Sequence, residues 1–415
     1  MSSGANTMKK SKAAPWTRPM PEEQFDWMRR ILAAPSPIGL EAAMSYGVLK
    51  PAFDSFKLSG WDIHQFKGNA GIVLDTHPGE DDRTSIMLVG HADKIRMQVR
   101  MVGDDGKVWI NSDSFLPSTL IGHEVQIFSE KPGSNGEYRV IEGGTVEAIG
   151  AIHFAPPDMR TGTKGIKPEM LYVELQACGK TPKKDIQKAG IKEGDAIILK
   201  RPIRHGFTAN TFYGAYLDNG LGCFIVAELG RLLAEAGGLK NMRVMFAIAS
   251  YEEIGRFGSR VLAGLLKPDI LVGVDVDHDY KAAPGVGEQH YTPNTIGAGF
   301  TLSSGSITSE YVNRMIDGVC RKHNIPCQRS PTGRDTGTDA MAAVLASIDA
   351  AAVSVGIPVR NMHTISEVAH TGDVLACIHA LKEALWEMDK ANRGRGLSRQ
   401  DLKDNHPRLD EAVTL

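Results

Sequence analysis

The stretch Arg243-Val-Met-Phe-Ala-Ile-Ala-Ser-Tyr-Glu-Glu-Ile-Gly255 decides the fold, because it predicts a buried strand that ends in two acidic residues. An apolar run of this kind is typical of strands covered on both faces in α/β proteins. Ligands bind at the carboxyl ends of such strands. In the loop beyond the strand, Glu252 and Glu253 can turn into one pocket, where one binds a metal and the other moves protons. The alternative is a solvated acidic pair at the start of a helix, the usual fate of an isolated Glu-Glu.

The composition is that of an ordinary globular protein. The 415 residues are enough for two or three domains, with 42% hydrophobic and 23% charged residues. A formal charge of −2 gives no electrostatic reason to expect nucleic acid or an acidic membrane surface as a partner. The five scattered cysteines argue against a disulfide framework and a cysteine zinc site. With no apolar signal core and no bilayer-length apolar run, we expect a cytoplasmic protein.

The chain alternates predicted strands and helices, with one β-rich interruption. From Ile95, apolar residues at 95, 97, 99 and 101 alternate with charged or polar ones, and glycine-rich turns separate further short β signals up to about residue 200. An inserted domain explains this better than one continuous sheet. We therefore expect a disordered N-terminus, a catalytic domain in two parts, an inserted β-rich domain and a mobile tail, over residues 1–20, 21–94 with 206–392, 95–205 and 393–415.

A second buried strand also ends in residues that can bind a metal. Ser85-Ile-Met-Leu-Val89 runs into Gly90-His91-Ala92-Asp93. His91 can bind a metal through one ring nitrogen while Asp93 fixes the other, the usual arrangement around a metal-bound histidine. Taken alone, His-x-Asp is more often a surface coincidence.

Three later segments bring further candidate ligands. Asp218 stands among glycines before a long predicted helix, where an N-cap is the commonest role and a crowded ligand site the alternative. Asp275 and Asp277 fall on the same face of one predicted strand, so periodicity does not choose between them. His363 lies in the last loop before the C-terminal helix.

Together these residues form a set of nitrogen and oxygen ligands without a thiolate. Such a set suits zinc first, with cobalt or manganese as alternatives. Five ligating side chains are too many for one open catalytic ion. They fit two divalent ions about 3.5–4 Å apart that share one carboxylate. Such a pair polarises a carbonyl oxygen and lowers the pKa of water toward 7.

The order and spacing of these motifs resemble the tetrahedral aminopeptidases, dinuclear metallopeptidases that include glutamyl and deblocking aminopeptidases and some proteins labelled endoglucanase. The resemblance runs from about residue 22 to 390. It rests on Gly90-His91-Ala-Asp93, Leu217-Asp218-Asn219, Glu252-Glu253-Ile-Gly255, Val274-Asp275-Val, Gly337-Thr-Asp339-Ala and Met362-His363-Thr-Ile-Ser-Glu367. In the insert, Tyr172-Val-Glu-Leu and Gly190-Ile-Lys-Glu-Gly-Asp195 are similar to the family's dimerisation domain.

The resemblance implies a role for each candidate residue. Asp218 would bridge the two ions and be followed by a cis peptide bond. Asp275 would be a ligand in preference to Asp277, and Glu252 would be the general base with Asp93 beside it. The first ion would be completed by His91 and Asp275, the second by Glu253 and His363. Substrate contacts are expected from Asn219, Arg334, Gly337, Thr338 and Asp339.

The resemblance also implies the fold and the partners. We expect an α/β catalytic domain with a mixed, mostly parallel sheet flanked by helices, as in zinc peptidases, and an inserted β-rich dimerisation domain. Peptides would be the substrates, and self-association through the insert would build a homododecamer from dimers. Lys94, Ile95 and Arg96 replace the usual acid and glycine after His-x-Asp, and Gly220 replaces a usual arginine. These departures bear on substrate preference and subunit contacts.

Three other functions compete with an aminopeptidase. A dinuclear carboxypeptidase or N-deacylase can use the same ligand order, but its extra domain generally falls between the third acidic ligand and the last histidine. Here the long gap lies between His91 and Asp218, which favours the aminopeptidase. A catalytically silent assembly protein is disfavoured because every presumed ligand and the base are present. Glycoside cleavage needs two carboxylates and does not call for this metal set.

Overall fold

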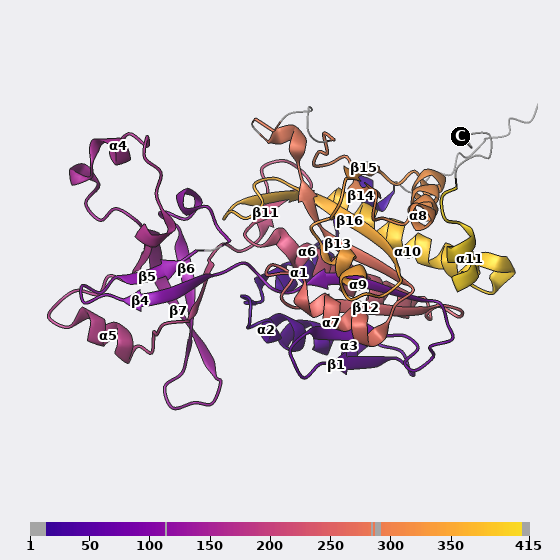
Figure 1. Cartoon of the computed structure of the whole chain (residues 1–415), viewed down its shortest axis with the longest axis horizontal. Coiled ribbons are helices and arrows are strands. Elements are labelled where there is room, and N and C mark those ends of the chain that lie inside the picture. Colours follow the sequence, from indigo (N-terminus) through magenta and orange to yellow (C-terminus); the bar gives the residue numbers. More distant parts are fainter. Residues whose placement is uncertain (1–13, 113, 284, 287–291, 409–415) are drawn as a thin grey trace, which may run out of the picture.

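The computed structural model describes residues 14–408 except 113, 284 and 287–291. Figure 1 shows a large α/β body joined to a smaller β body made from the purple segment of the chain. Among the described residues, no helix combines the length and the apolar character of a membrane span.

The large body is built on an eight-stranded sheet with the order β1-β2-β12-β3-β13-β16-β14-β15. The four strands β12, β3, β13 and β16 are parallel to one another, β14 is antiparallel to β16, and β15 is parallel to β14. This confirms the predicted mixed, mostly parallel sheet. In sheet order, the bounds are Asp62–Gln65, Gly71–Asp75, Arg243–Ala249, Ser85–His91, Ile270–His278, Ala351–Val359, Phe300–Gly305 and Cys327–Thr332.

Alternation along the strands sorts the side chains into two separate cores. In β12, Val244, Phe246 and Ile248 belong to the larger core, whereas Met245 and Ala247 belong to the smaller one on the other face. The larger core is covered by α1 (Glu22–Ala33), α2 (Ala42–Met44), α3 (Lys50–Phe56), α6 (Leu217–Glu235), α8 (Glu310–His323) and α10 (Thr371–Gly394). The smaller core is covered by α7 (Phe257–Leu266) and α9 (Ala342–Leu345). Both faces of the sheet are therefore covered by helices and shielded from solvent, as its uniformly apolar strands predict.

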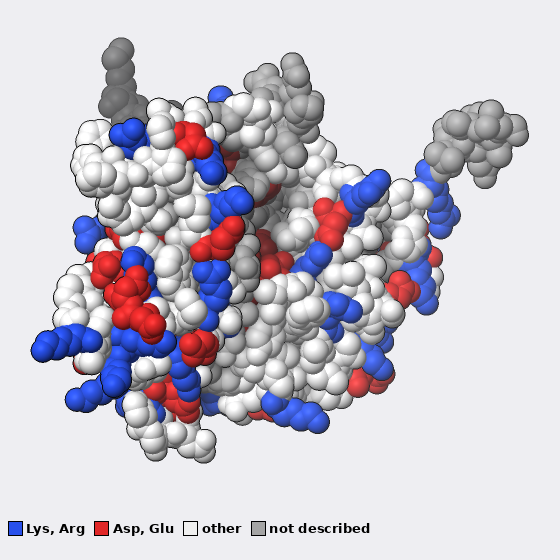
Figure 2. All heavy atoms as spheres, turned by 60° about the vertical axis from the view of Figure 1, so that its left-hand side comes forward, with Lys and Arg blue, Asp and Glu red and all other residues white. Residues whose placement is uncertain are grey.

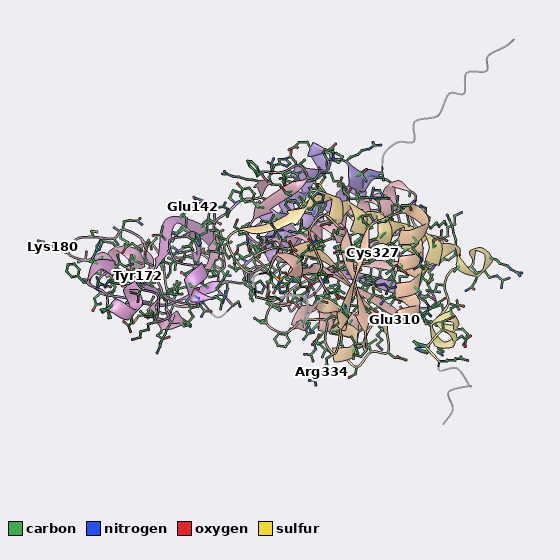
Figure 3. The ribbon with its side chains drawn as sticks, turned by 90° about the horizontal axis from the view of Figure 1, so that it is seen from above. Glu142, Tyr172, Lys180, Glu310, Cys327 and Arg334 are labelled. Carbon is green, nitrogen blue, oxygen red and sulfur yellow. The ribbon has the colours of Figure 1, made fainter. Side chains whose placement is uncertain are left out.

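The small body is a closed barrel with the strand order β4-β5-β8-β7-β6-β9 and its own apolar core. Its strands are Met97–Val102, Val108–Asn111, Tyr172–Glu174, Tyr138–Glu147, Glu124–Glu130 and Ala196–Leu199, with α4 (Pro157–Arg160) and α5 (Pro182–Lys188) between them. In Figure 3, Glu142, Tyr172 and Lys180 mark this barrel, well apart from Glu310 and Cys327 of the large body.

The simple alternation predicted for the first barrel strand is wrong at its end. Met97 and Val99 point into the barrel core as expected, but Met101 is 49% exposed and Val102 is buried instead. The pairing of β4 with β5 shifts between Val99 and Met101. An extra residue at such a bulge reverses the faces of all later residues in the strand.

A three-stranded sheet, β10 (Arg204–His205), β11 (Thr211–Gly214) and β17 (Glu367–His370), lies where the chain returns from the barrel. The sequence patterns did not predict it. Gly214 pairs with Glu367, so the segment that enters α6 lies beside the segment that follows His363. Two parts of the chain about 150 positions apart are thereby joined next to their candidate ligands.

Both predicted disordered ends are partly ordered. Pro15–Thr17 forms a 3-10 turn and Met20 is buried, while residues 1–13 lie outside the described residues. In the predicted tail, α11 (Arg399–Asp404) begins with a capping box between Ser398 and Asp401. Arg399 also donates to Asp269 of the large body at 2.7 Å. The expectation of a mobile tail is therefore wrong up to this helix, and residues 409–415 lie outside the described residues.

Candidate metal centre

The candidate ligands converge because neighbouring parallel strands end at the same edge of the sheet. His91 is the last residue of β3, Asp275 lies in the adjacent strand β13, and the Glu252-Glu253 pair follows β12 on the other side of β3. Asp218 enters at the start of α6, and His363 from the loop before β17. On the face drawn in Figure 2, the surface is hollowed and acidic side chains lie inside the hollow.

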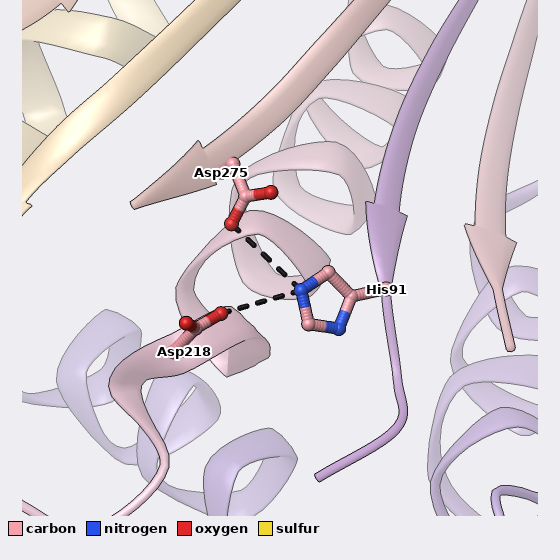
Figure 4. Close-up of side chains that lie close together, drawn as sticks. All are labelled: His91, Asp218 and Asp275. Carbon is pink, nitrogen blue, oxygen red and sulfur yellow. Dashed lines mark ion pairs between the residues drawn. The ribbon is translucent and has the colours of Figure 1, made fainter. Parts of the chain in front are cut away.

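The first group consists of His91, Asp218 and Asp275, all of them buried (Figure 4). His91 Nε2 lies 3.2 Å from Asp218 Oδ1 and 3.8 Å from Asp275 Oδ1. One ligand atom from each residue lies within 4.8 Å of the others, close enough to surround one cation. Asp277, the alternative on the same strand, instead accepts a hydrogen bond from Asn294.

The second group consists of Asp218, Glu253 and His363. His363 Nε2 lies 3.1 Å from Asp218 Oδ2 and 3.8 Å from Glu253 Oε1. Asp218 therefore belongs to both groups, and each of its oxygens faces a different histidine. The His363 side chain is 38% exposed, whereas that of His91 is 1% exposed, so the second group is the more open one.

The residues present fit a pair of cations. Asp218 Oδ1 and Glu253 Oε1 are buried oxygens with no hydrogen-bond donor. Leaving such an acceptor unsatisfied costs about 1–3 kcal/mol, and more when it is charged. Two imidazoles and three carboxylates are also a donor set suited to zinc, cobalt or manganese.

Burial and mutual repulsion keep protons on this cluster. Burial raises the pKa of Glu253 and of Asp275 well above the ordinary value, and the neighbouring Asp218 raises both further. Burial disfavours the charged form of His91, yet the neighbouring carboxylates of Asp218 and Asp93 outweigh this and raise its pKa. Asp218 behaves differently: burial opposes its charge, but the two histidines beside it favour the charged form and lower its pKa. Without cations, the cluster therefore holds protons that cations would displace.

Asp93 lies against the second ring nitrogen of His91, as its spacing predicts, and also holds the acidic loop. His91 Nδ1 lies 3.2 Å from the backbone oxygen of Asp93 and 3.5 Å from its carboxylate. The Asp93 carboxylate also accepts the backbone N–H groups of Glu252 (3.0 Å) and Glu253 (3.1 Å). Because Asp93 is 0% exposed, it positions the acidic loop and does not meet substrate.

Glu252 lies beside the first group, with Oε2 3.8 Å from His91 Nε2 and a side chain that is 10% exposed. Burial raises the pKa of Glu252 to about 8, and the carboxylates of Asp339, Asp218 and Asp93 contribute to this rise. Asp339 is itself buried: one oxygen accepts a short hydrogen bond from Ser259, and the other has no partner. The buried Asp339 therefore influences Glu252 through its charge.

The predicted substrate contacts lie in different surroundings and stay predictions. Asn219 is 1% exposed, and both its polar atoms are used: Nδ2 donates to the Val274 carbonyl (2.9 Å) and Oδ1 accepts from Gly222 N (2.7 Å). Arg334 is exposed and points away from the body in Figure 3. Gly337 is exposed at a positive φ of 72°, and Thr338 is buried, with its hydroxyl 3.3 Å from that of Ser354.

The departures from the family pattern lie against helix α1. Lys94 is buried, and Nζ donates to the carbonyls of Leu32 (2.7 Å) and Ala34 (2.6 Å). Burial lowers the pKa of Lys94 to about 7. A side chain at Gly220 would clash with Leu32, because its Cβ would lie 2.6 Å from Leu32 Cγ. The expected effect of Lys94 on substrate preference is therefore corrected to a structural one.

Arg256, which the sequence patterns did not single out, fastens the acidic loop. Its guanidinium donates to Asp335 at 2.6 Å, and its backbone N–H donates to the Glu252 carbonyl at 2.8 Å. The loop carrying Glu252 is thus tied to the loop that precedes Asp339. Its spacing gave no signal, because the partner lies 79 positions away.

The family of M42 glutamyl aminopeptidases matches residues 71–379 of this chain. The chain belongs to this family. M42 proteins are metal-dependent peptidases, so the chain is a hydrolase that acts on peptide bonds. This confirms the family resemblance stated from the motifs. The cis peptide bond implied at Asp218-Asn219 is present as well.

Individual relatives agree with the family match. Lysyl aminopeptidase of Pyrococcus furiosus is 26% identical over 377 residues, which cover 88% of this chain and 97% of that protein. A TET aminopeptidase from the archaeon Thaumarchaeota archaeon SCGC AB-539-E09 superposes with a TM-score of 0.77 at 20% identity, over 92% of this chain and 99% of that one. The TET1 peptidase of Pyrococcus horikoshii, described as assembling into a tetrahedron or a large octahedral shell, gives 0.69 at 18% identity, over 86% and 99%.

The raised pKa values of the cluster predict that metal binding releases protons. The pKa values of His91, Glu253 and Asp275 are all raised, so these groups hold protons more tightly than usual and a cation must displace protons to bind. Zinc affinity should therefore fall as the pH is lowered. Calorimetric titration of the metal-free protein in two buffers with different ionisation enthalpies should give different heats. Identical heats would mean that no protons are released.

Removing the His363 side chain should weaken metal binding by the second ligand group only. His363→Ala takes away one of its three ligands while His91 and Asp275 remain, so the protein should hold one ion tightly and the other weakly. Metal analysis after dialysis measures this. His153→Ala, an exposed histidine of the barrel region, is the control and should retain the full content. Unchanged metal content in His363→Ala would contradict the assignment.

Proposed function

We propose that this chain is an aminopeptidase that removes the N-terminal residue of peptides with two divalent ions, zinc before cobalt or manganese. The observation that carries the proposal is the shared Asp218, whose two oxygens face His91 and His363 separately. A carboxylate between two ligand groups is what a two-ion site needs. Glu253 and Asp275 each add one carboxylate to one group only.

In the proposed reaction, Glu252 acts as the general base. When bound, the ions polarise the scissile carbonyl and lower the pKa of water. Glu252 takes a proton from the attacking water and delivers it to the leaving amine, which becomes the new N-terminus. A pKa of about 8 places this carboxyl close to neutral pH, where proton transfer in both directions is efficient. Asp93 holds the base in place through the backbone N–H of Glu252.

The other functions have less support. The carboxypeptidase and N-deacylase alternatives share the ligand order, but the family match and the curated lysyl aminopeptidase both favour removal of an N-terminal residue. A solved protein described as an endoglucanase shares the fold at 16% identity, which bears on the fold alone. The direct test measures metal per chain and cleavage of a panel of aminoacyl-anilides, with and without chelator. Chelator-resistant cleavage, or cleavage only of carboxyl-terminal residues, would contradict the proposal.

Glu252→Gln should distinguish a role in proton transfer from a role in metal binding. The amide keeps the size of the side chain but cannot accept the proton, so turnover should fall about 10²–10⁴-fold. Both ions should remain, because Glu252 belongs to neither ligand group. Glu253→Gln is the contrasting variant and should lose metal along with turnover. Anilide hydrolysis and metal analysis measure both; near-normal turnover in Glu252→Gln would remove it from the mechanism.

We also propose that the barrel joins copies of this chain, first as dimers and then as a dodecameric shell. The barrel region exposes large apolar side chains: Leu116 is 71% exposed, Ile152 55% and Phe154 90%. Ile152 and Phe154 lie on one short 3-10 turn, and exposed apolar groups that lie together can mark an association surface. Relatives with this fold include proteins described as a dodecamer and as a tetrahedral or octahedral shell.

Charged substitutions on the barrel should therefore break the assembly. Phe154→Asp combined with Leu116→Asp should lower the mass measured by light scattering, because a charge cannot be buried cheaply in an apolar contact. Phe207→Asp changes an exposed phenylalanine in the turn between β10 and β11, outside the barrel, and should leave the mass unchanged. Equal masses for the barrel variant and the unmodified protein would contradict the proposed interface.

A further inference from the structure

Glu367 is a buried carboxylate with no role in the ligand groups or in proton transfer. It begins strand β17 and is 2% exposed. Its Oε2 accepts the backbone N–H of Leu217 at 2.6 Å and that of Asp218 at 3.3 Å. Its Oε1 accepts the backbone N–H of His363 at 2.8 Å. One carboxylate thus holds the backbones of the shared ligand and of the last histidine.

The two segments that Glu367 joins are in unfavourable backbone conformations. Tyr216, just before the bonded N–H groups, has φ = 65°, and His363 itself has φ = 60°. Residues other than glycine rarely adopt this left-handed backbone conformation, so contacts with neighbouring groups must hold both residues in it. The N–H groups at the start of α6 also have no partner within their own helix. Glu367 supplies the acceptors that both segments lack.

The position of Glu367 fixes a separation that matters for the second ligand group. Asp218 Oδ2 and His363 Nε2 are 3.1 Å apart, although the residues come from α6 and from a loop 145 positions later. Elsewhere the loop is held mainly to itself: Thr364 donates to the Asn361 carbonyl, and Asn361 donates to the Ser366 carbonyl. Glu367 is the acceptor that connects the His363 backbone to the start of α6.

We propose that Glu367 is a positioning residue that sets the distance between Asp218 and His363 and so builds the second metal position. This inference rests on the proposed two-ion function. It differs from the role of Asp93, which holds the acidic loop carrying Glu252 and Glu253. The two buried carboxylates therefore position different halves of the site, each through backbone N–H groups.

The test uses Glu367→Gln in the full-length protein. The amide offers one acceptor oxygen, and its NH2 group would face backbone donors on the other side, so one of the two segments loses its support. Partners that orient ligands typically change metal affinity about 10–100-fold. We expect one of the two ions to bind about 10–100-fold more weakly and the other to bind normally. Calorimetric titration of zinc into the metal-free protein measures both affinities.

Asp389→Asn is the matched control. Asp389 is also a buried carboxylate, 4% exposed, and it accepts the backbone N–H groups of Asn241 (2.7 Å) and Met242 (3.1 Å). It lies on α10, at the end of that helix, and belongs to neither ligand group. Both variants should lose some thermal stability, but Asp389→Asn should bind both ions with unchanged affinity. Equal weakening in both variants would show a general loss of stability and overturn the inference.

A second measurement does not depend on the ions. In a crystal structure of metal-free Glu367→Gln, Asp218 Oδ2 and His363 Nε2 should lie clearly further apart than 3.1 Å. An unchanged separation, or unchanged affinity for both ions, would overturn the role of Glu367. An unmodified protein that binds fewer than two ions would instead contradict the proposed two-ion function, and the crystal distance would still decide the role of Glu367.

Discussion

The structure depends on the placement of one carboxylate, that of Asp218, between two histidines that enter from opposite ends of the chain. Asp218 Oδ1 faces His91 and Oδ2 faces His363. The geometry follows from the sheet order, because β12, β3 and β13 are adjacent and parallel and their ends deliver glutamates, a histidine and an aspartate to one edge. Asp218, at the start of α6, lies at the same edge of the sheet, between the two histidines.

Gathering four or more carboxylates in a buried place is costly in the free energy of folding. Burial disfavours their charged forms, and each carboxylate raises the pKa of its neighbours. Backbone N–H groups offset part of this cost. They donate to the carboxylates of Asp93 and Glu367, so no positively charged side chain is needed next to the ligands. Buried oxygens such as Glu253 Oε1 remain without donors. Such unsatisfied oxygens lower the stability of the fold locally, but they leave the carboxylates free to bind cations. A trade of stability for function of this kind is expected at functional sites.

The residues that depart from the family pattern show how such a site tolerates change. Lys94 follows the candidate ligand His91 at the end of β3, yet its ammonium group turns toward the end of α1 and donates to two carbonyls there. Gly220 follows the shared ligand and lets Leu32 of the same helix approach closely. Both residues therefore contact the end of α1 and belong to neither ligand group.

The sequence by itself predicted the strands of the large sheet, most helices, the family and the residues that gather at the site, because hydrophobic periodicity and short motifs are local properties. Apolar runs predicted β3, β12 and β13, and alternation predicted the barrel strands until the bulge at Met101. Only the tertiary structure decided that Asp93 holds the acidic loop, that Asn219 faces inward, and that Glu367 links α6 to His363. These contacts join residues 55 to 159 positions apart or depend on which way a side chain turns. Sequence spacing carries no record of either, because strand order and loop paths are set by packing of the whole chain.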